Sequence, residues 1–141
     1  MPIHLEKLLP AAAADSKRND PRPPRGMNRR LNALAALLSG APADVDGRGR
    51  LVWRNEHKEV MALAVTRQLV VGRAAGCDLT FASPRVSRCH CTVIPGLSSD
   101  ELIDHNSTNG TLVNGARVRR HTLQDGDLIE LGGERMAYAR Q

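Results

Sequence analysis

The chain has 141 residues, of which 41% are hydrophobic but only 2% aromatic, and its formal net charge is +5. This length predicts one domain with an additional tail. No apolar run approaches the roughly 18 residues of a membrane-spanning helix, so no such helix is expected, and a core must consist mainly of Val, Leu, Ile and Ala.

The basic excess lies in the first part of the chain. Residues 1–58 contain 11 Lys/Arg and 6 Asp/Glu, from totals of 20 and 15, so residues 59–141 are balanced. Glu6 and Lys7 interrupt the first apolar segment, which argues against a secretory signal and predicts a cytoplasmic protein. A basic leader could contact nucleic acid or an acidic protein face. Its composition favours a solvated, largely disordered segment instead.

Residues 1–49 are predicted to form a flexible N-terminal extension with one short helix. Prolines and charges dominate residues 10–26, which is typical of a linker. Within residues 28–39, four apolar residues recur at helical spacing: Leu31, Leu34, Ala35 and Leu38. A helix this short is marginal alone in water. It either docks on its own domain or folds on contact with a partner, and the sequence leaves both open.

Residues 50–141 predict an all-β domain of about eleven short strands. Gly, Asn and Asp turns separate short apolar runs, the pattern of a sandwich or barrel. Asn114-Gly115 is the strongest hairpin signal, because a type I′ turn needs positive φ at both positions. The strands are expected at Leu51–Arg54, Glu59–Val65, Gln68–Val71, Leu79–Phe81, His90–Ile94, Glu101–Ile103, Thr111–Val113, Ala116–Val118, His121–Thr122, Asp127–Glu130 and Arg135–Ala139.

Three polar loops follow the ends of predicted strands. They are Val71-Gly72-Arg73, Ser87-Arg88-Cys89-His90 and the stretch from Asp104 to Thr111. Together they supply two guanidinium groups, several hydroxyls and a side-chain amide. A guanidinium offers a bidentate fork to a phosphate, so the set suits a phosphate monoester on an extended peptide.

These motifs, in this order and spacing, resemble the forkhead-associated (FHA) domain. The resemblance rests on Gly-Arg at 72–73, Ser-x-x-His at 87–90, Asp-x-x-Ser-Thr-Asn-Gly-Thr at 104–111 and Asn-Gly at 114–115. It covers residues 50–141 and implies an FHA-like β-sandwich. Such a domain is expected to bind phosphothreonine peptides through loops at one end.

The resemblance also implies roles for single residues. The phosphate is expected to contact Arg73, Ser87 and Arg88, with Thr108 at its edge, while the Asn109 amide holds the peptide backbone. A second group is expected to hold the loops in shape: Gly72, His90, Gly110 and Asn114. For Asn114, a second contact to the peptide backbone remains an equal alternative.

Neither metal binding nor catalysis is expected. Cys89 and Cys91 flank His90, but on a strand they would point away from it, so the three could not converge on zinc. Cys91 is expected to pack in the core, and all three cysteines to be reduced. Ser87, His90 and Asp104 do not indicate a hydrolase, because no Gly-x-Ser-x-Gly elbow is present. No nucleotide fingerprint appears either, so no cofactor is expected.

The leading hypothesis is a phosphothreonine-dependent protein-binding module, an adaptor or signalling component downstream of a Ser/Thr kinase. The alternative is a constitutive FHA-fold scaffold that does not need phosphate. Partner contact through residues 28–39 and a weaker nucleic-acid hypothesis for the leader also remain. Because Met1 to Val65 contains no threonine, and only Ser16 and Ser39 as hydroxyl residues, the relevant phosphothreonine is expected on another protein.

Overall fold

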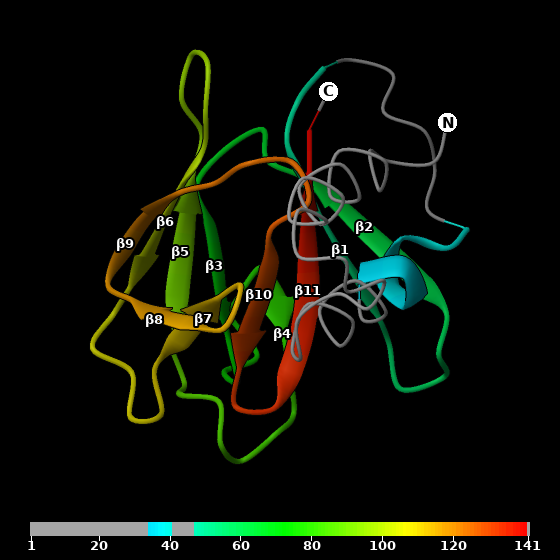
Figure 1. Ribbon diagram of the computed structural model, residues 1–141. Helices are drawn as coiled ribbons and strands as arrows, with labels where there is room; N and C mark the ends of the chain where they lie inside the picture. Colours follow the sequence, from blue (N-terminus) through cyan, green and yellow to red (C-terminus); the bar gives the residue numbers. More distant parts are fainter. Residues whose placement is uncertain (1–33, 41–46, 141) are drawn as a thin grey trace, which may run out of the picture.

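The computed structural model describes residues 34–40 and 47–140 of the chain (Figure 1). Most of the predicted extension, including Leu31 and the basic leader, lies outside the described residues. Within them, no helix is long and apolar enough to cross a membrane.

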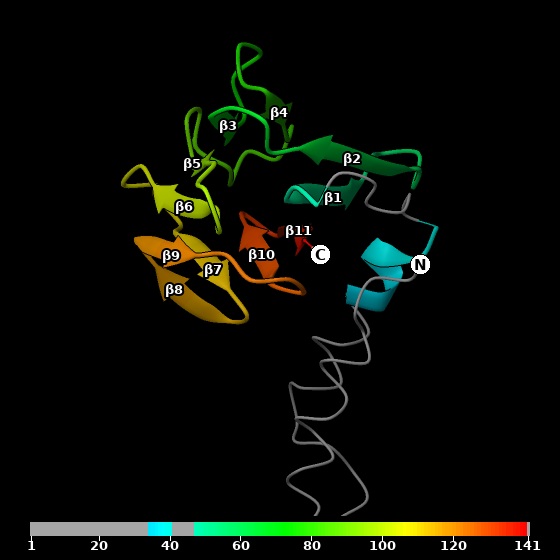
Figure 2. The same ribbon diagram turned by 90° about the horizontal axis from the view of Figure 1, so that it is seen from above.

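In the described part of the chain, eleven strands form two sheets that pack face to face (Figures 1 and 2), which confirms the all-β sandwich. Each of the predicted runs overlaps one observed strand. The six-stranded sheet has the order β2-β1-β11-β10-β7-β8, and the five-stranded sheet the order β4-β3-β5-β6-β9. The strands are β1 (Arg50–Arg54), β2 (Val60–Ala64), β3 (Leu69–Gly72), β4 (Leu79–Thr80), β5 (Cys91–Ile94), β6 (Glu101–Asp104), β7 (Thr111–Val113), β8 (Ala116–Val118), β9 (Arg120–Thr122), β10 (Leu128–Leu131) and β11 (Glu134–Ala139).

Alternation along the strands of the six-stranded sheet creates two apolar layers. Side chains on a strand point alternately to its two faces. Leu51, Met136 and Tyr138 therefore join the core between the sheets. Their neighbours Val52 and Ala137 belong to a second cluster on the outer face of the same sheet.

The helical segment 34–38 covers this outer face (Figure 2). Leu34, Leu37 and Leu38 are all less than a tenth exposed and pack in the outer cluster. Arg54 on β1 fixes the end of the segment, because its Nε donates to the carbonyl of Ala36 at 2.8 Å and its Nη2 to that of Ser39 at 2.9 Å. The sequence left open whether this helix docks on its own domain or folds on contact with a partner. In the structure, the described part of the helix docks on its own domain.

The Asn114-Gly115 turn joins β7 and β8 as a two-residue hairpin. Both residues have positive φ, 54° at Asn114 and 87° at Gly115, as a type I′ turn requires. The Asn114 side chain also holds β10, since it donates to Asp127 Oδ1 at 2.9 Å and accepts from the Leu128 amide at 2.9 Å. Both polar atoms of this amide are therefore used inside the domain.

Candidate functional site

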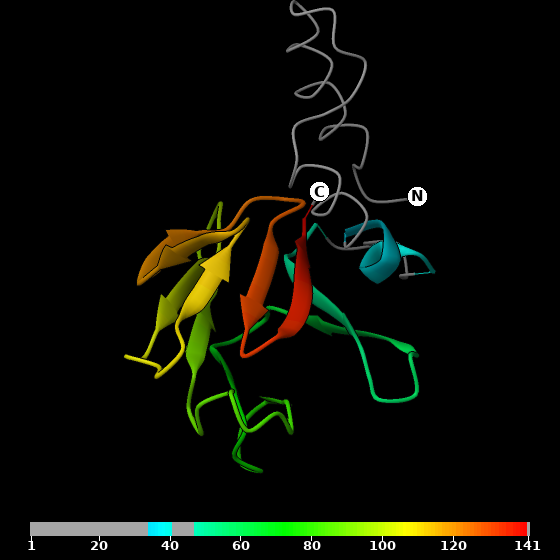
Figure 3. The same ribbon diagram turned by 60° about the horizontal axis from the view of Figure 1, so that its bottom comes forward.

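Three loops meet at one end of the sandwich, which comes forward in Figure 3. They connect β3 to β4, β4 to β5 and β6 to β7. The first two are tied by backbone hydrogen bonds, from Arg73 N to Ser87 O at 3.0 Å and from Ala74 N to Arg88 O at 3.1 Å. Gly72 lies where these segments cross, and a Cβ there would collide with the Arg88 carbonyl group. A glycine at this position allows the two loops to approach closely.

His90 connects the second loop to the third. It is fully buried, and its Nδ1 accepts from the Ser87 amide at 3.0 Å while its Nε2 faces the Gly110 carbonyl at 2.9 Å. A carbonyl only accepts, so the neutral tautomer with hydrogen on Nε2 satisfies both contacts. The geometry therefore gives His90 two contacts that set the shape of the loops.

Asp104 organises the third loop from the end of β6. Its carboxylate accepts from the Ser107 hydroxyl at 2.5 Å, the Ser107 amide at 3.0 Å and the Thr111 hydroxyl at 2.7 Å. Partial burial by itself raises the pKa of Asp104, but the hydrogen bonds from Ser107 and Thr111 outweigh burial and hold this pKa below its ordinary value. The ionised carboxylate thus holds the segment that presents Thr108 and Asn109.

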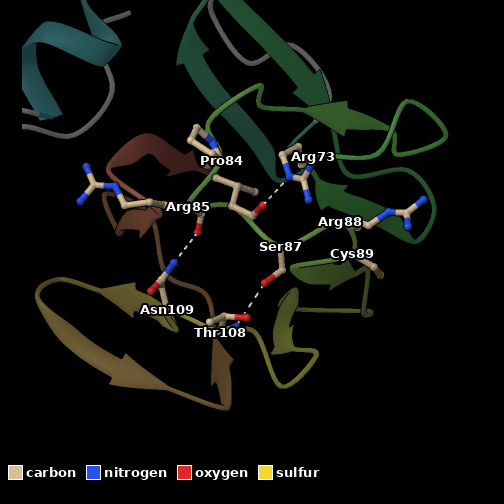
Figure 4. Close-up of a pocket in the computed structure, with 9 residues that line it drawn as sticks. Arg73, Pro84, Arg85, Ser87, Arg88, Cys89, Thr108 and Asn109 are labelled. Atoms are coloured by element: carbon tan, nitrogen blue, oxygen red, sulfur yellow. Dashed lines mark hydrogen bonds between the residues drawn. The ribbon is translucent and has the colours of Figure 1, made fainter.

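The side chains of Arg73 and Ser87 are each fixed by one hydrogen bond to the protein and still have donors that a ligand could use (Figure 4). The Nε of Arg73 donates to the Val86 carbonyl at 3.1 Å, and neither terminal nitrogen of the guanidinium bonds to a residue that the structure describes, so both remain for another acceptor. The Ser87 hydroxyl oxygen accepts from the Thr108 amide at 3.1 Å, so its own hydrogen remains available to donate. Both side chains can therefore donate to an anion without losing these contacts.

Asn109 contacts the second loop through one end of its amide. Its Nδ2 donates to the Arg85 carbonyl at 2.8 Å. One N–H and the Oδ1 atom make no hydrogen bond to the residues that the structure describes. An extended peptide could use this remaining donor and acceptor.

A shallow pocket of about 420 Å³ lies among these loops (Figure 4). Its lining includes all five residues predicted to contact a phosphopeptide and four that were not predicted to contact it. The full set is Arg73, Pro84, Arg85, Val86, Ser87, Arg88, Cys89, Thr108 and Asn109. Three guanidinium groups and no carboxylate line it, so the pocket is suited to an anion.

The other four predicted residues lie outside the pocket lining, and the Asn114 side chain is bonded to the start of β10 and not to the pocket loops. Gly72, His90, Gly110 and Asn114 are absent from its lining. Arg85 is the main pocket residue that the sequence analysis missed, because it belongs to none of the motifs that resemble the FHA domain. Its place two residues before Ser87, in the same loop, is the one local signal that could have suggested it.

The structure confirms the prediction for Cys91 but not the strand geometry assumed for Cys89 and His90. Cys89 and His90 precede β5, which begins at Cys91, so the strand rule does not apply to them. Cys89 is exposed at the pocket whereas Cys91 is completely buried, as expected for a core residue. Among the described residues, no group of three or more His, Cys, Asp and Glu side chains could hold a metal ion.

The structure is a β-sandwich whose loops form a pocket suited to an anion. Comparison with known proteins identifies the family to which this domain belongs. The FHA domain profile matches residues 69–132. The ABC transporter ATP-binding/permease protein Rv1747 of Mycobacterium tuberculosis is 39% identical over 69 residues, which are 49% of this chain and 8% of that protein. The chain thus spans less than a tenth of the length of this relative.

Solved FHA domains have the same fold. One, from a study of phosphothreonine-dependent FHA domain interactions, is 29% identical with a TM-score of 0.60 and covers 67% of this chain and 97% of its own. Another, the FHA domain of FhaA in complex with the intracellular domain of Rv3910, is 30% identical with a TM-score of 0.57 and covers 64% and 98%. The chain therefore belongs to the FHA family, whose domain is a binding module.

Proposed function

We propose that this chain binds phosphothreonine-containing segments of partner proteins through the pocket among its three loops. It acts as an adaptor or signalling component downstream of a Ser/Thr kinase, in the cytoplasm. In Rv1747 the similar segment is a small part of a much longer protein, and the FHA domain of FhaA has been solved in a complex with the intracellular domain of Rv3910. The partner and the kinase pathway are part of the proposal.

The arrangement of Arg73 is the observation that carries the proposal. Because its Nε is bonded to the Val86 carbonyl, the two terminal nitrogens can form a bidentate fork on a phosphate. The Ser87 hydroxyl and the Arg88 guanidinium belong to the same pocket lining. A phosphate dianion would thus receive several donors, two of them charged.

Thr108 and Asn109 give the ligand its direction. Thr108 is held by its amide contact to Ser87, and Asn109 by its contact to Arg85. We assign Thr108 to the edge of the phosphate site and Asn109 to the peptide backbone, where its remaining donor and acceptor fix the register. Arg85 lines the other side of the pocket and supplies a further positive charge to the ligand.

The test is a calorimetric titration with one peptide in phosphothreonine and unmodified forms. We expect binding of the phosphorylated form only, and Arg73→Ala should cost about 2–5 kcal/mol of binding free energy with the fold intact. Arg119→Ala removes the same charge from an exposed arginine outside the pocket and should bind as the parent does.

Each other outcome has a defined meaning. Equal binding of both peptide forms would support the alternative function, a constitutive scaffold that does not need phosphate. Unchanged affinity of the Arg73→Ala protein would remove Arg73 from the phosphate site. Binding of DNA with a steep dependence on salt concentration would support the nucleic-acid hypothesis for the leader instead.

A further inference from the structure

Two of the three cysteines lie together beside the pocket, and the function proposed above does not use them. Cys89 is exposed and lines the pocket, while Cys77 is half-buried in the loop between β3 and β4. Cys91 is buried in the core, and burial raises the pKa of its thiol to about 12. It is therefore an unreactive internal control for the other two.

The Arg88 carbonyl brings Cys77 and Cys89 together. The Cys77 thiol donates to this carbonyl with 3.2 Å between sulfur and oxygen, and Cys89 is the next residue. Standard bond lengths then place the Cys77 sulfur within about 7 Å of the Cys89 Cα. Burial raises the pKa of the Cys77 thiol, and the neighbouring Cys89 raises it further.

We infer that Cys77 and Cys89 form an oxidisable pair whose disulfide weakens ligand binding in the adjacent pocket. The effect on binding rests on the proposed function, whereas formation of the disulfide does not. Both cysteines lie outside the strands, on loops at the same end of the sandwich. Loop backbone can move to the Cα separation of about 4.4–6.8 Å that a disulfide requires.

The oxidant is a low-molecular-weight disulfide such as oxidised glutathione. The Cys89 thiolate attacks one of its sulfurs, forming a mixed disulfide and releasing one glutathione thiolate. The Cys77 thiolate then attacks the Cys89 sulfur and releases the second. Two protein thiols and one glutathione disulfide thus give one protein disulfide and two glutathione thiols. The guanidinium groups of the pocket attract the anionic reagent to Cys89 first.

The disulfide acts on the pocket through the residues between and beside the two sulfurs. The Arg88 carbonyl now accepts from both the Cys77 thiol and the Ala74 amide. Oxidation removes the first of these donors and turns the Cys89 side chain from the pocket toward Cys77. Ser87 and Arg88 are on the segment that must shift, so phosphate contacts are lost.

Thermodynamic linkage makes the coupling reciprocal. We expect the disulfide to lower the affinity for a phosphothreonine peptide at least tenfold. A saturating peptide must then disfavour oxidation by the same factor, and a tenfold change in a two-electron couple moves the reduction potential about 30 mV upward. If the disulfide has no effect on peptide binding, its reduction potential will be the same with and without the peptide.

The first experiment measures the disulfide without any peptide ligand. The full chain is equilibrated in glutathione redox buffers, blocked with an alkylating agent and digested with trypsin. Cleavage after arginines separates Cys77 from the peptide that holds Cys89 and Cys91, and fragmentation distinguishes the last two. We expect a Cys77–Cys89 crosslink with Cys91 alkylated. Free thiols throughout, a glutathione adduct that persists on Cys89, or a crosslink to Cys91 would overturn the inference.

The second experiment measures phosphopeptide affinity before and after oxidation. Cys77→Ser keeps a hydroxyl donor for the Arg88 carbonyl, so it should bind as the parent does when reduced and form no internal disulfide. The parent should lose affinity on oxidation and regain it with dithiothreitol. A crosslinked parent with undiminished affinity would refute the switch. If reduced protein binds no phosphopeptide, the proposed function fails, and the crosslink stands or falls on the first experiment.

Discussion

Hydrogen bonds to the protein orient the polar side chains of this pocket. Arg73 uses its Nε to bond the Val86 carbonyl, and Ser87 uses its hydroxyl oxygen to accept from the Thr108 amide. Both side chains keep other donors for a ligand. The protein-facing contacts restrict rotamers before any ligand arrives. Less conformational entropy is then lost on binding, which is the advantage of a preorganised site.

Asp104 makes the third loop sensitive to acid. Its pKa is lower in the folded protein than its ordinary value, so its contribution to stability is present above the unfolded pKa of about 3.9 and is lost as pH falls through the folded pKa. We expect Asp104→Asn to lower the free energy of unfolding by about 1–3 kcal/mol at neutral pH, because an amide cannot accept all three hydrogen bonds.

The pH profile tests this assignment. Thermal unfolding of the parent and of Asp104→Asn is followed from neutral pH down to pH 2, and their difference should shrink below about pH 4. Glu56→Gln, at an exposed carboxylate in the turn between β1 and β2, should match the parent throughout. A difference that stays constant into acid would mean that the carboxylate charge of Asp104 does not stabilise the loop.

At the scale of elements, the helical segment 34–38 functions as a cover for one sheet. Leu34 is fully buried against the outer face, where the small side chains of Ala137 and Ala139 let a helix approach. We expect Leu34→Ala to lower the free energy of unfolding by about 2–5 kcal/mol, the range for large-to-small core changes. Denaturant unfolding measures it.

The matched control is Leu97→Ala, since Leu97 is fully exposed (105%) and the same substitution there should change stability by less than about 0.5 kcal/mol. The affinity of the Leu34→Ala protein for phosphopeptide should remain at the parent value, because the segment packs on the outer face of the sheet and not in the pocket. Equal unfolding midpoints for Leu34→Ala and Leu97→Ala would show that the docked helix adds nothing to stability.

The strands could be predicted from the sequence because their signals are local. Alternating apolar residues and turn residues such as Asn114-Gly115 carry the information within a few positions. The docking of the helix could not be predicted, since it depends on Arg54, 18 residues from Ala36. Arg85 was missed for a similar reason: its position at the pocket is fixed by the Asn109 amide, 24 residues away.

At the scale of the whole molecule, the pocket and the docked helix occupy different surfaces. The loops that form the pocket lie at one end of the sandwich, and β11 ends at the opposite end (Figures 1 and 3). The helical segment covers the outer face of the six-stranded sheet. Ser39 follows this segment, and its carbonyl is held by Arg54, so Ser39 must leave that contact to approach the pocket.

This separation favours a switch in trans. Met1 to Val65 holds no threonine, and its hydroxyl residues are Ser16 and Ser39. A phosphoserine lacks the γ-methyl group of phosphothreonine, and burial of one methyl group is worth roughly 1 kcal/mol. Tethering offsets part of that loss through an effective concentration of about millimolar, but occupation by Ser39 also requires the helix contacts to break. We therefore expect the phosphothreonine to come from another protein.

The test is incubation of the chain with a Ser/Thr kinase, followed by titration with a phosphothreonine peptide. Kinase treatment should leave the affinity of the parent unchanged, because no phosphothreonine can form in the leader and a leader phosphoserine competes poorly. The double variant Ser16→Ala with Ser39→Ala is the control, since it removes both leader hydroxyls and leaves every residue of the pocket lining in place. If treatment abolishes binding by the parent but not by the double variant, the leader occupies its own pocket and the switch operates in cis.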